Sequence, residues 1–449
     1  MHNDRTYASV AVFAGVLAAG LLLATLAWHI PFMLWDHLDF APIYAGWQHG
    51  NLGQTGFLRI HGGHLHTAAY AILLVTTWLS QGHPWLDCVV SWMLLVGCAA
   101  VVFALCRRTL PLCDGGDGWL ILLLSFLALY PGHLANLQWG WQVAVFLCLF
   151  GSVVAVAALG AERLTWRGNA IALVATLLAL LSFATALALL PIALLLIALR
   201  TELRLKDRLL LALPWLLSGL VAAYAGRSGI GVLRNFSSTS IAHAAGRVAP
   251  VDLGLYVLNY LGAGIAAFAP ALAPWLAALA LASGAVAWWQ VRERRAALPW
   301  LGLFLFAVIG AVLTGLARVN EGGAQQAFAP RYVSLSIPFW IGWIGLFALA
   351  AARRADMPRN APISLKWLWP VAALAAINAL AMTRDAQRVG RDTRALAQTL
   401  CATYPQISEN VLAGLMYAGA QAARERLQIV HQLQFPPFDE CIAPAADTH

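Results

Sequence analysis

Charged side chains are scarce in this chain of 449 residues: Asp, Glu, Lys and Arg make up 11%, whereas hydrophobic residues make up 61%. A soluble globular protein carries about 25% charged residues, so the composition excludes an ordinary soluble domain. Lysine is nearly absent, with Lys206 and Lys366 the only examples, and no lysine-rich tail of the kind that binds nucleic acid is present. The net charge of +8 comes from short arginine clusters between apolar runs. We therefore predict an integral membrane protein with no nucleic-acid partner.

Apolar runs long enough to cross a bilayer recur along the chain, since a transmembrane helix needs about 17–25 apolar residues. The candidates cover residues 8–29, 64–80, 84–106, 118–133, 140–160, 169–184, 186–200, 209–224, 268–290, 297–316, 332–352 and 366–382. The first run lacks a clear small-residue cleavage site, and we interpret it as an uncleaved first span. The run 64–80 is short and polar at both ends, which predicts a helix lying along the membrane surface. A true span there, with a break missed elsewhere, is the alternative.

The distribution of basic residues favours about eleven spans with the N-terminus in the cytoplasm. This arrangement places most arginines in short cytoplasmic loops, as the positive-inside rule requires, and if 64–80 crossed, the later clusters would all face outward. The preference for Arg over Lys, with much Ala and Leu, is typical of a GC-rich bacterial genome. We therefore predict an all-α polytopic protein of the bacterial cytoplasmic (inner) membrane. Residues 1–382 form the transmembrane domain, with a periplasmic first loop at about 31–83 and surface helices there. Residues 383–449 form a small helical periplasmic tail.

The tail differs in kind from the rest of the chain. Residues 384–401 and 408–434 mix charged residues with Ala and Leu at helical spacing. It contains Cys401 and Cys441, and two cysteines alone in an oxidising compartment tend to form a disulfide. Two separate free thiols remain the alternative, because spacing never proves a bridge.

Two carboxylates directly follow the first span. Asp36 and Asp39 are three residues apart, so a helical turn places both on one face at the outer membrane surface. A carboxylate there can act as general base for an incoming hydroxyl. Alternatively, Asp36 caps the following helix and Asp39 lies in its first turn.

Farther along the first loop, an arginine and three histidines lie within eight residues. They are Arg59, His61, His64 and His66. The His-x-x-His spacing lacks a flanking Glu, so a hydrolytic zinc motif is not supported, and whether a divalent metal binds is left open. These groups can instead bind a phosphate or a sugar hydroxyl. Solvated interfacial histidines at a helix start are the alternative.

A second outer turn, residues 131–142, combines amides with tryptophans. His133, Asn136, Trp139 and Gln142 offer hydrogen bonds to hydroxyls and an aromatic face for a sugar ring. An aromatic belt with capping amides is the alternative.

The last outer loop ends with an arginine and a tyrosine at the mouth of a span. Arg331 precedes Tyr332, and Arg318 lies earlier in the same loop. An arginine at that depth is costly unless it meets an anion, and a guanidinium binds phosphate through two parallel hydrogen bonds. A snorkelling arginine on an ordinary phospholipid headgroup is the alternative.

Together, these features resemble the GT-C glycosyltransferases, in particular bacterial members related to protein mannosyltransferases and to aminoarabinose or arabinosyl transferases. The resemblance covers about residues 1–382 and is strongest at Asn136–Gln142 and Arg331–Tyr332. It implies transfer of a sugar from a polyprenyl-phosphate carrier to a hydroxyl of a lipid, glycan or protein at the periplasmic face. Asp36 or Asp39 would deprotonate the acceptor. Arg331, with Tyr332, Arg59 or Arg318, would bind the donor phosphate.

Two other classes of membrane protein remain open. A transporter or flippase for lipids or sugars would be expected to carry ionisable residues deep in its spans and two similar halves; the predicted spans are nearly free of charge and show no repeat. An O-antigen ligase or polymerase uses the same lipid donors but presents its basic residues in a large late outer loop. In this chain, the outer loop with the most polar motifs is the first one.

Overall fold

The computed structural model describes residues 2–58, 60–62, 64–110, 118–228, 248–353, 368–439 and 441. Within them the protein is a helical bundle with one two-stranded sheet. Six helical segments in these described ranges are long and apolar enough to cross a membrane: Tyr7–Trp28, Trp85–Thr109, Gly118–Leu137, Gly140–Leu159, Arg294–Gly322 and Pro330–Ala351. Shorter apolar helices accompany them. The chain is therefore a multi-pass membrane protein, as predicted.

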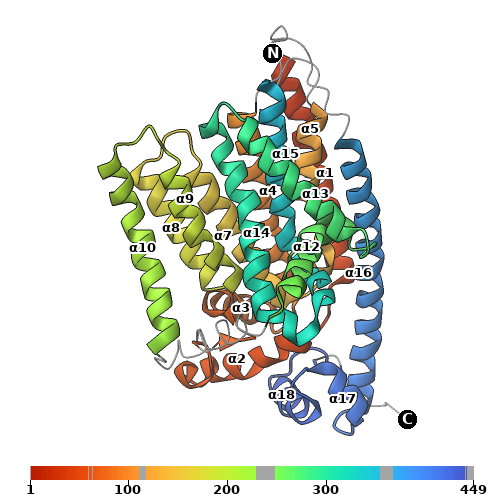
Figure 1. Cartoon of the computed structure of the whole chain (residues 1–449). Coiled ribbons are helices and arrows are strands. Elements are labelled where there is room, and N and C mark those ends of the chain that lie inside the picture. Colours follow the sequence, from red (N-terminus) through yellow and green to blue (C-terminus); the bar gives the residue numbers. More distant parts are fainter. Residues whose placement is uncertain are drawn as a thin grey trace, which may run out of the picture.

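The bundle consists of helices of different lengths packed side by side (Figure 1). They are α1 (His2–Trp28), α4 (Trp85–Thr109), α5 (Gly118–Ala128), α7 (Val143–Leu159), α8 (Trp166–Leu180), α9 (Leu189–Ala198), α10 (Leu205–Ser228), α12 (Pro250–Ala266), α13 (Ala273–Gln290), α14 (Arg294–Gly322), α15 (Pro330–Arg353) and α16 (Trp369–Thr403). Helices satisfy their own backbone hydrogen bonds, which a bilayer demands. Small residues let α14 and α15 approach closely: a Cβ at Gly342 would lie 2.5 Å from the carbonyl oxygen of Trp300.

Helix α12 was not predicted from the sequence. Its residues fall between the predicted spans 209–224 and 268–290, and Asp252 and Asn259 interrupt their apolar pattern. In the fold, Asn259 is buried and donates a hydrogen bond to the carbonyl of Ala324 at 3.0 Å. A tertiary contact thus satisfies the polar side chain that interrupts the apolar pattern of this helix.

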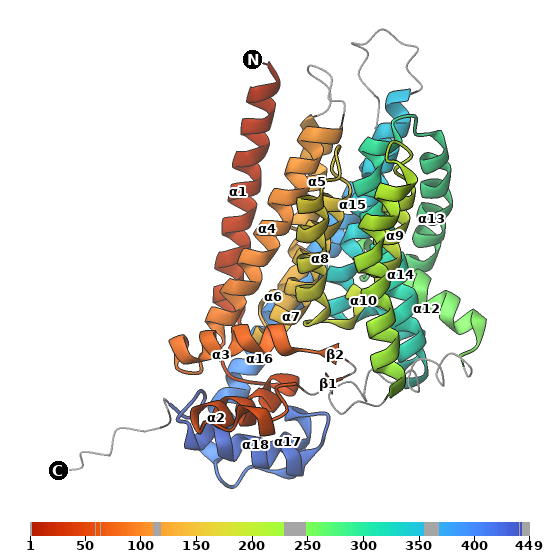
Figure 2. The same ribbon diagram turned by 90° about the vertical axis from the view of Figure 1, so that its left-hand side faces the viewer.

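Helix α3 (Thr67–Ser80) lies crosswise at one end of the bundle (Figure 2). Its 14 residues span about 21 Å, shorter than the roughly 30 Å hydrocarbon core of a bilayer. The N–H of Ala68 donates to the carbonyl of Leu181 at 2.9 Å, and the Thr76 hydroxyl donates to the buried carboxylate of Asp87. These contacts hold α3 against the ends of its neighbours, the position expected for a surface helix.

The first loop and the tail occupy the end of the molecule opposite the N-terminus (Figure 2). The loop contributes η1 (Trp35–Phe40), α2 (Ala41–Gln48), η2 (Leu52–Gln54), β1 (Ile60–His61) and β2 (His64–Leu65), and the tail contributes α17 (Glu409–Leu415) and α18 (Ala420–Gln432). Strands β1 and β2 pair antiparallel, with His61 opposite His64. The connection passes through Gly62 with φ of 56°, a left-handed conformation that suits glycine.

The tail differs from its predicted outline in two respects. Helix α16 runs unbroken for 35 residues, so the predicted domain boundary at 382/383 falls inside a helix. The predicted helix 408–434 is instead two helices, separated by a turn that includes Gly419 with φ of 92°. Helix α17 ends where the backbone becomes extended at Met416, and Gly419 immediately precedes α18.

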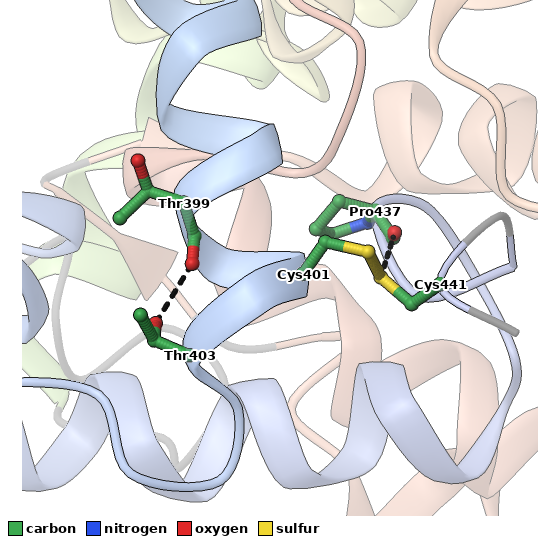
Figure 3. Close-up of a disulfide and its surroundings, with 5 residues drawn as sticks. All are labelled: Thr399, Cys401, Thr403, Pro437 and Cys441. Carbon is green, nitrogen blue, oxygen red and sulfur yellow. Dashed lines mark hydrogen bonds between the residues drawn. A yellow bond between two sulfur atoms is a disulfide. The ribbon is translucent and has the colours of Figure 1, made fainter. Parts of the chain in front are cut away.

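A disulfide joins Cys401 on α16 to Cys441 near the chain's end, with the Cα atoms 5.4 Å apart (Figure 3). The Sγ of Cys441 lies 2.8 Å from the carbonyl oxygen of Pro437. The predicted pairing is therefore confirmed.

The tail and the first loop share one hydrophobic core. The rings of Tyr44 and Phe435 lie 5.2 Å apart, and Phe435 also packs against Gly82, where no side chain would fit. At the edge of this core, His83 Nε2 lies 3.1 Å from Asp439 Oδ2. The tail is thus folded against the loop that carries the predicted carboxylates.

Candidate functional site

A cavity of about 880 Å³ opens at the end of the bundle where the first loop and tail lie. It brings together five chain segments far apart in the sequence: the first loop, the turn 131–142, the loop before α15, helix α16 and the tail. The predicted site residues that line it are Asp36, His61, His64, Asn136, Trp139, Gln142, Arg318 and Arg331. The bundle therefore gathers most of the predicted polar motifs around one space.

The two carboxylates of η1 share one imidazole. His61 Nε2 lies 3.7 Å from Asp36 Oδ1, and His61 Nδ1 lies 3.7 Å from Asp39 Oδ2. A 3₁₀ helix has three residues per turn, so residues three apart eclipse each other and both carboxylates face the same partner. Asp39 also pairs with Arg426 of α18, at 3.2 Å. Asp36 lines the cavity, whereas Asp39 lies behind it against the tail.

Charge compensation sets the protonation of this pair. Burial raises the pKa of Asp36, but the nearby His61 and the charge of Arg331 outweigh it, so the pKa lies below the usual value. Burial lowers the pKa of His61, yet the nearby carboxylates of Asp36 and Asp39 raise it above the usual value. The pair therefore favours a carboxylate beside an imidazolium.

Residues behind η1 fix its position. The N–H of Ile30 donates to the carbonyl of Gln138 at 2.8 Å. Trp35 has φ of 54°, an uncommon conformation for a residue with a bulky side chain. His37 is fully buried, 3.9 Å from the Asp87 carboxylate, and burial lowers its pKa to about 3. The turn that presents Asp36 is thus held from both ends.

Burial disfavours the charged form of His64 and His66. The N–H of Ala184 donates to His64 Nδ1 at 3.1 Å, and the His64 ring stacks on Phe183 at 3.8 Å. Burial and nearby positive charges lower the pKa of His64 well below its usual value, and burial lowers that of His66 to about 3. Within the described ranges, no group of three or more His, Cys, Asp or Glu is arranged to hold a metal ion.

Arg331 is the arginine on the cavity wall without a carboxylate partner in the described part of the chain. Arg318 pairs with Glu321 at 2.6 Å and donates to the carbonyl of Gly62, and Arg388 pairs with Asp385 at 2.9 Å. The guanidinium of Arg331 instead lies 5.1 Å from the ring of Tyr332. Its hydrogen-bonding capacity is therefore available to an anion entering the cavity.

The amide turn supports α15 as well as lining the cavity. Asn136 Nδ2 donates to the carbonyl of Pro330 at 2.7 Å and to Ser334 Oγ at 2.6 Å. Trp139 Nε1 donates to the carbonyl of Leu34 at 3.2 Å. Through these contacts, the turn connects the segment before Asp36 to the first turn of α15, which carries Arg331.

Three predicted residues that the structure describes do not line the cavity: Asp39, His133 and Tyr332. His133 is buried, with Nδ1 2.8 Å from Ser334 Oγ. Tyr332 is buried against Tyr260, with ring centroids 5.3 Å apart. Arg59 lies outside the described residues.

Several cavity residues were not predicted. They are Trp35, Trp141, Phe183, Asp385, Arg388 and Tyr417. Charged residues immediately after the last apolar run are a sequence signal for Asp385 and Arg388, because they lie at the membrane surface. No comparable signal marks Tyr417, which arrives through the fold of the tail.

Comparison of the chain with protein-family models, with curated proteins and with solved structures finds no significant match in any of the three.

Proposed function

We propose that the protein is a membrane glycosyltransferase of the GT-C kind. It transfers a sugar from a polyprenyl-phosphate carrier to a hydroxyl of a glycan, lipid or protein. The reaction takes place at the face that carries the first loop and the tail, the periplasmic face of a bacterial cytoplasmic membrane.

One observation carries the proposal: a carboxylate and an arginine with no carboxylate partner among the described residues line the same cavity at one end of a membrane bundle. Asp36 lies in η1, shortly after the end of α1, and Arg331 lies in the first turn of α15, so both belong to the level where the bundle's helices end. A donor anchored in lipid by its isoprenoid tail places its phosphate at that level. A hydroxyl acceptor arrives there from water.

The transfer needs a base and a cation. The Asp36 carboxylate takes the proton of the acceptor hydroxyl as its oxygen attacks the anomeric carbon of the sugar. The bond between that carbon and the phosphate oxygen breaks, and the electron pair leaves on polyprenyl phosphate. The guanidinium of Arg331 stabilises the added negative charge through two N–H donors. The proton on Asp36 then passes to water.

The proposal is tested with the full-length protein in lipid vesicles loaded with a panel of labelled polyprenyl-phosphate sugars and a bacterial membrane extract as acceptor. We expect one labelled sugar to appear on an acceptor as free polyprenyl phosphate accumulates, both measured by mass spectrometry. Transfer of a preassembled glycan would favour the ligase or polymerase. Movement of labelled lipid across the vesicle wall without transfer would favour the flippase.

The proposed orientation is tested separately with topology reporters. A reporter fused after Arg354 is expected to read cytoplasmic, and one fused after Gln432 is expected to read periplasmic, because eleven crossings place the ends of the bundle on opposite sides. A cytoplasmic signal after Gln432 would contradict the eleven-span arrangement.

A further inference from the structure

Tyr417 is the most exposed large side chain among the described residues that line the cavity. Its side chain is 91% exposed, yet it belongs to the cavity wall together with Asp36 and Arg331. An aromatic ring left in water at the edge of a polar cavity gains no packing energy from the fold. Such a ring is available for an incoming group.

The tail holds this ring in place. Tyr417 lies in the turn between α17 and α18, where its neighbours Leu415 and Met416 are buried in the core shared with the first loop. The ion pair between Arg426 and Asp39 and the Cys401–Cys441 disulfide fasten the same unit to the site. Tyr417 is therefore presented to the cavity by a fixed support.

The surroundings of the ring indicate the chemistry of its ligand. Glu321, Asp385 and Arg388 also line the cavity and are largely exposed, and each belongs to an ion pair. Paired charges of both signs select no net charge in a ligand but offer donors and acceptors to hydroxyl groups. An exposed aromatic face beside such groups suits a sugar ring, whose C–H face stacks while its hydroxyls form hydrogen bonds.

We propose that Tyr417 is an acceptor-contacting residue and that the acceptor is a neutral, sugar-bearing molecule that approaches from water beside the tail. The C-terminal tail then contributes an acceptor-binding residue to the transfer site. This inference rests on the proposed glycosyltransferase function, because it assigns the acceptor side of that reaction.

The test uses the full-length protein in lipid nanodiscs and two probes. Undecaprenyl phosphate, measured by native mass spectrometry, reports on the donor side. An array of immobilised neutral bacterial oligosaccharides reports on the acceptor side. Tyr417→Ala is expected to lower array binding about 5–10-fold, on the scale of one aromatic contact, with undecaprenyl phosphate binding unchanged. Tyr417→Phe keeps the ring and is expected to bind like the wild type. Gln428→Ala, an exposed tail position away from the cavity, is the matched control.

The outcomes separate this inference from the function on which it rests. Equal array binding by Tyr417→Ala and the wild type would overturn the role of Tyr417 while leaving the transferase intact. So would a wild type that binds undecaprenyl phosphate but no oligosaccharide. A wild type that binds neither probe would overturn the transferase proposal and this inference with it.

Discussion

Asp36→Asn is expected to lower sugar transfer about 100-fold or more, the usual scale for loss of a general base. The substitution keeps the size of the side chain and removes the charge that accepts the proton. Undecaprenyl phosphate binding should stay near the wild-type level, because the donor phosphate is held by Arg331. The measurement is turnover with a polyprenyl-phosphate sugar in vesicles.

Asp39→Asn is the matched control for this prediction. Asp39 contacts the same imidazole but lies off the cavity and pairs with Arg426, so a smaller loss is expected. Near-normal turnover in both variants would show that neither carboxylate is the base.

The pH dependence follows from the partners of Asp36. The groups that lower its pKa against the effect of burial are His61 and Arg331. Transfer needs the ionised carboxylate, which is present above the pKa and lost as the pH falls through it. His61→Gln removes the strongest of the lowering contacts, so the pKa rises and the acid limb of the rate profile moves to higher pH. An unchanged acid limb would show that His61 does not set the pKa of the base.

Several residues that line the cavity could be picked out from the sequence because polar groups are rare in this chain. Asp36, His61 and Arg331 stand out against apolar runs, and placing the runs in a membrane puts all three at one surface. That constraint acts along a single axis, the membrane normal. It explains why residues 295 positions apart, Asp36 and Arg331, could be assigned to one site.

Contacts within the plane of the membrane could not be predicted in the same way. Nothing in the local pattern shows that His61 bridges both carboxylates or that Arg426 reaches Asp39 across 387 positions. Asn136 was expected to offer its amide to a sugar, yet two of its hydrogen bonds go to the start of α15. These contacts depend on how helices pack sideways, which periodicity and hydropathy leave undetermined.

The tail shows a further limit. Its charged helices were predicted as an appendage, but their sequence pattern does not show which surface of the protein they pack against. The structure folds them onto the first loop through buried side chains such as Leu412 and Phe435, so Tyr417 reaches the cavity. Hydrophobic spacing identified these helices but not the surface they cover.

Arg331→Ala is expected to weaken donor binding and turnover together, because the donor phosphate is present before and during the reaction. A hydrogen bond to a charged group contributes about 1.5–3 kcal/mol, so undecaprenyl phosphate should bind about 10- to 100-fold more weakly. Turnover at saturating donor should fall a further 100-fold or so, since loss of one group that stabilises developing charge commonly costs that much. Native mass spectrometry and the vesicle assay measure the two effects.

Two further variants test whether the loss is specific to the guanidinium of Arg331. Arg331→Lys keeps the charge but cannot form two parallel hydrogen bonds, so it should bind the phosphate with intermediate affinity and remain well below the wild type in turnover. Arg424→Ala removes an arginine of the tail that pairs with Glu409 and does not line the cavity, so both measurements should stay at the wild-type level. Equal donor binding by Arg331→Ala and Arg424→Ala would mean that the carrier phosphate binds elsewhere. The cavity between Asp36 and Arg331 would then not be the place where donor and acceptor meet.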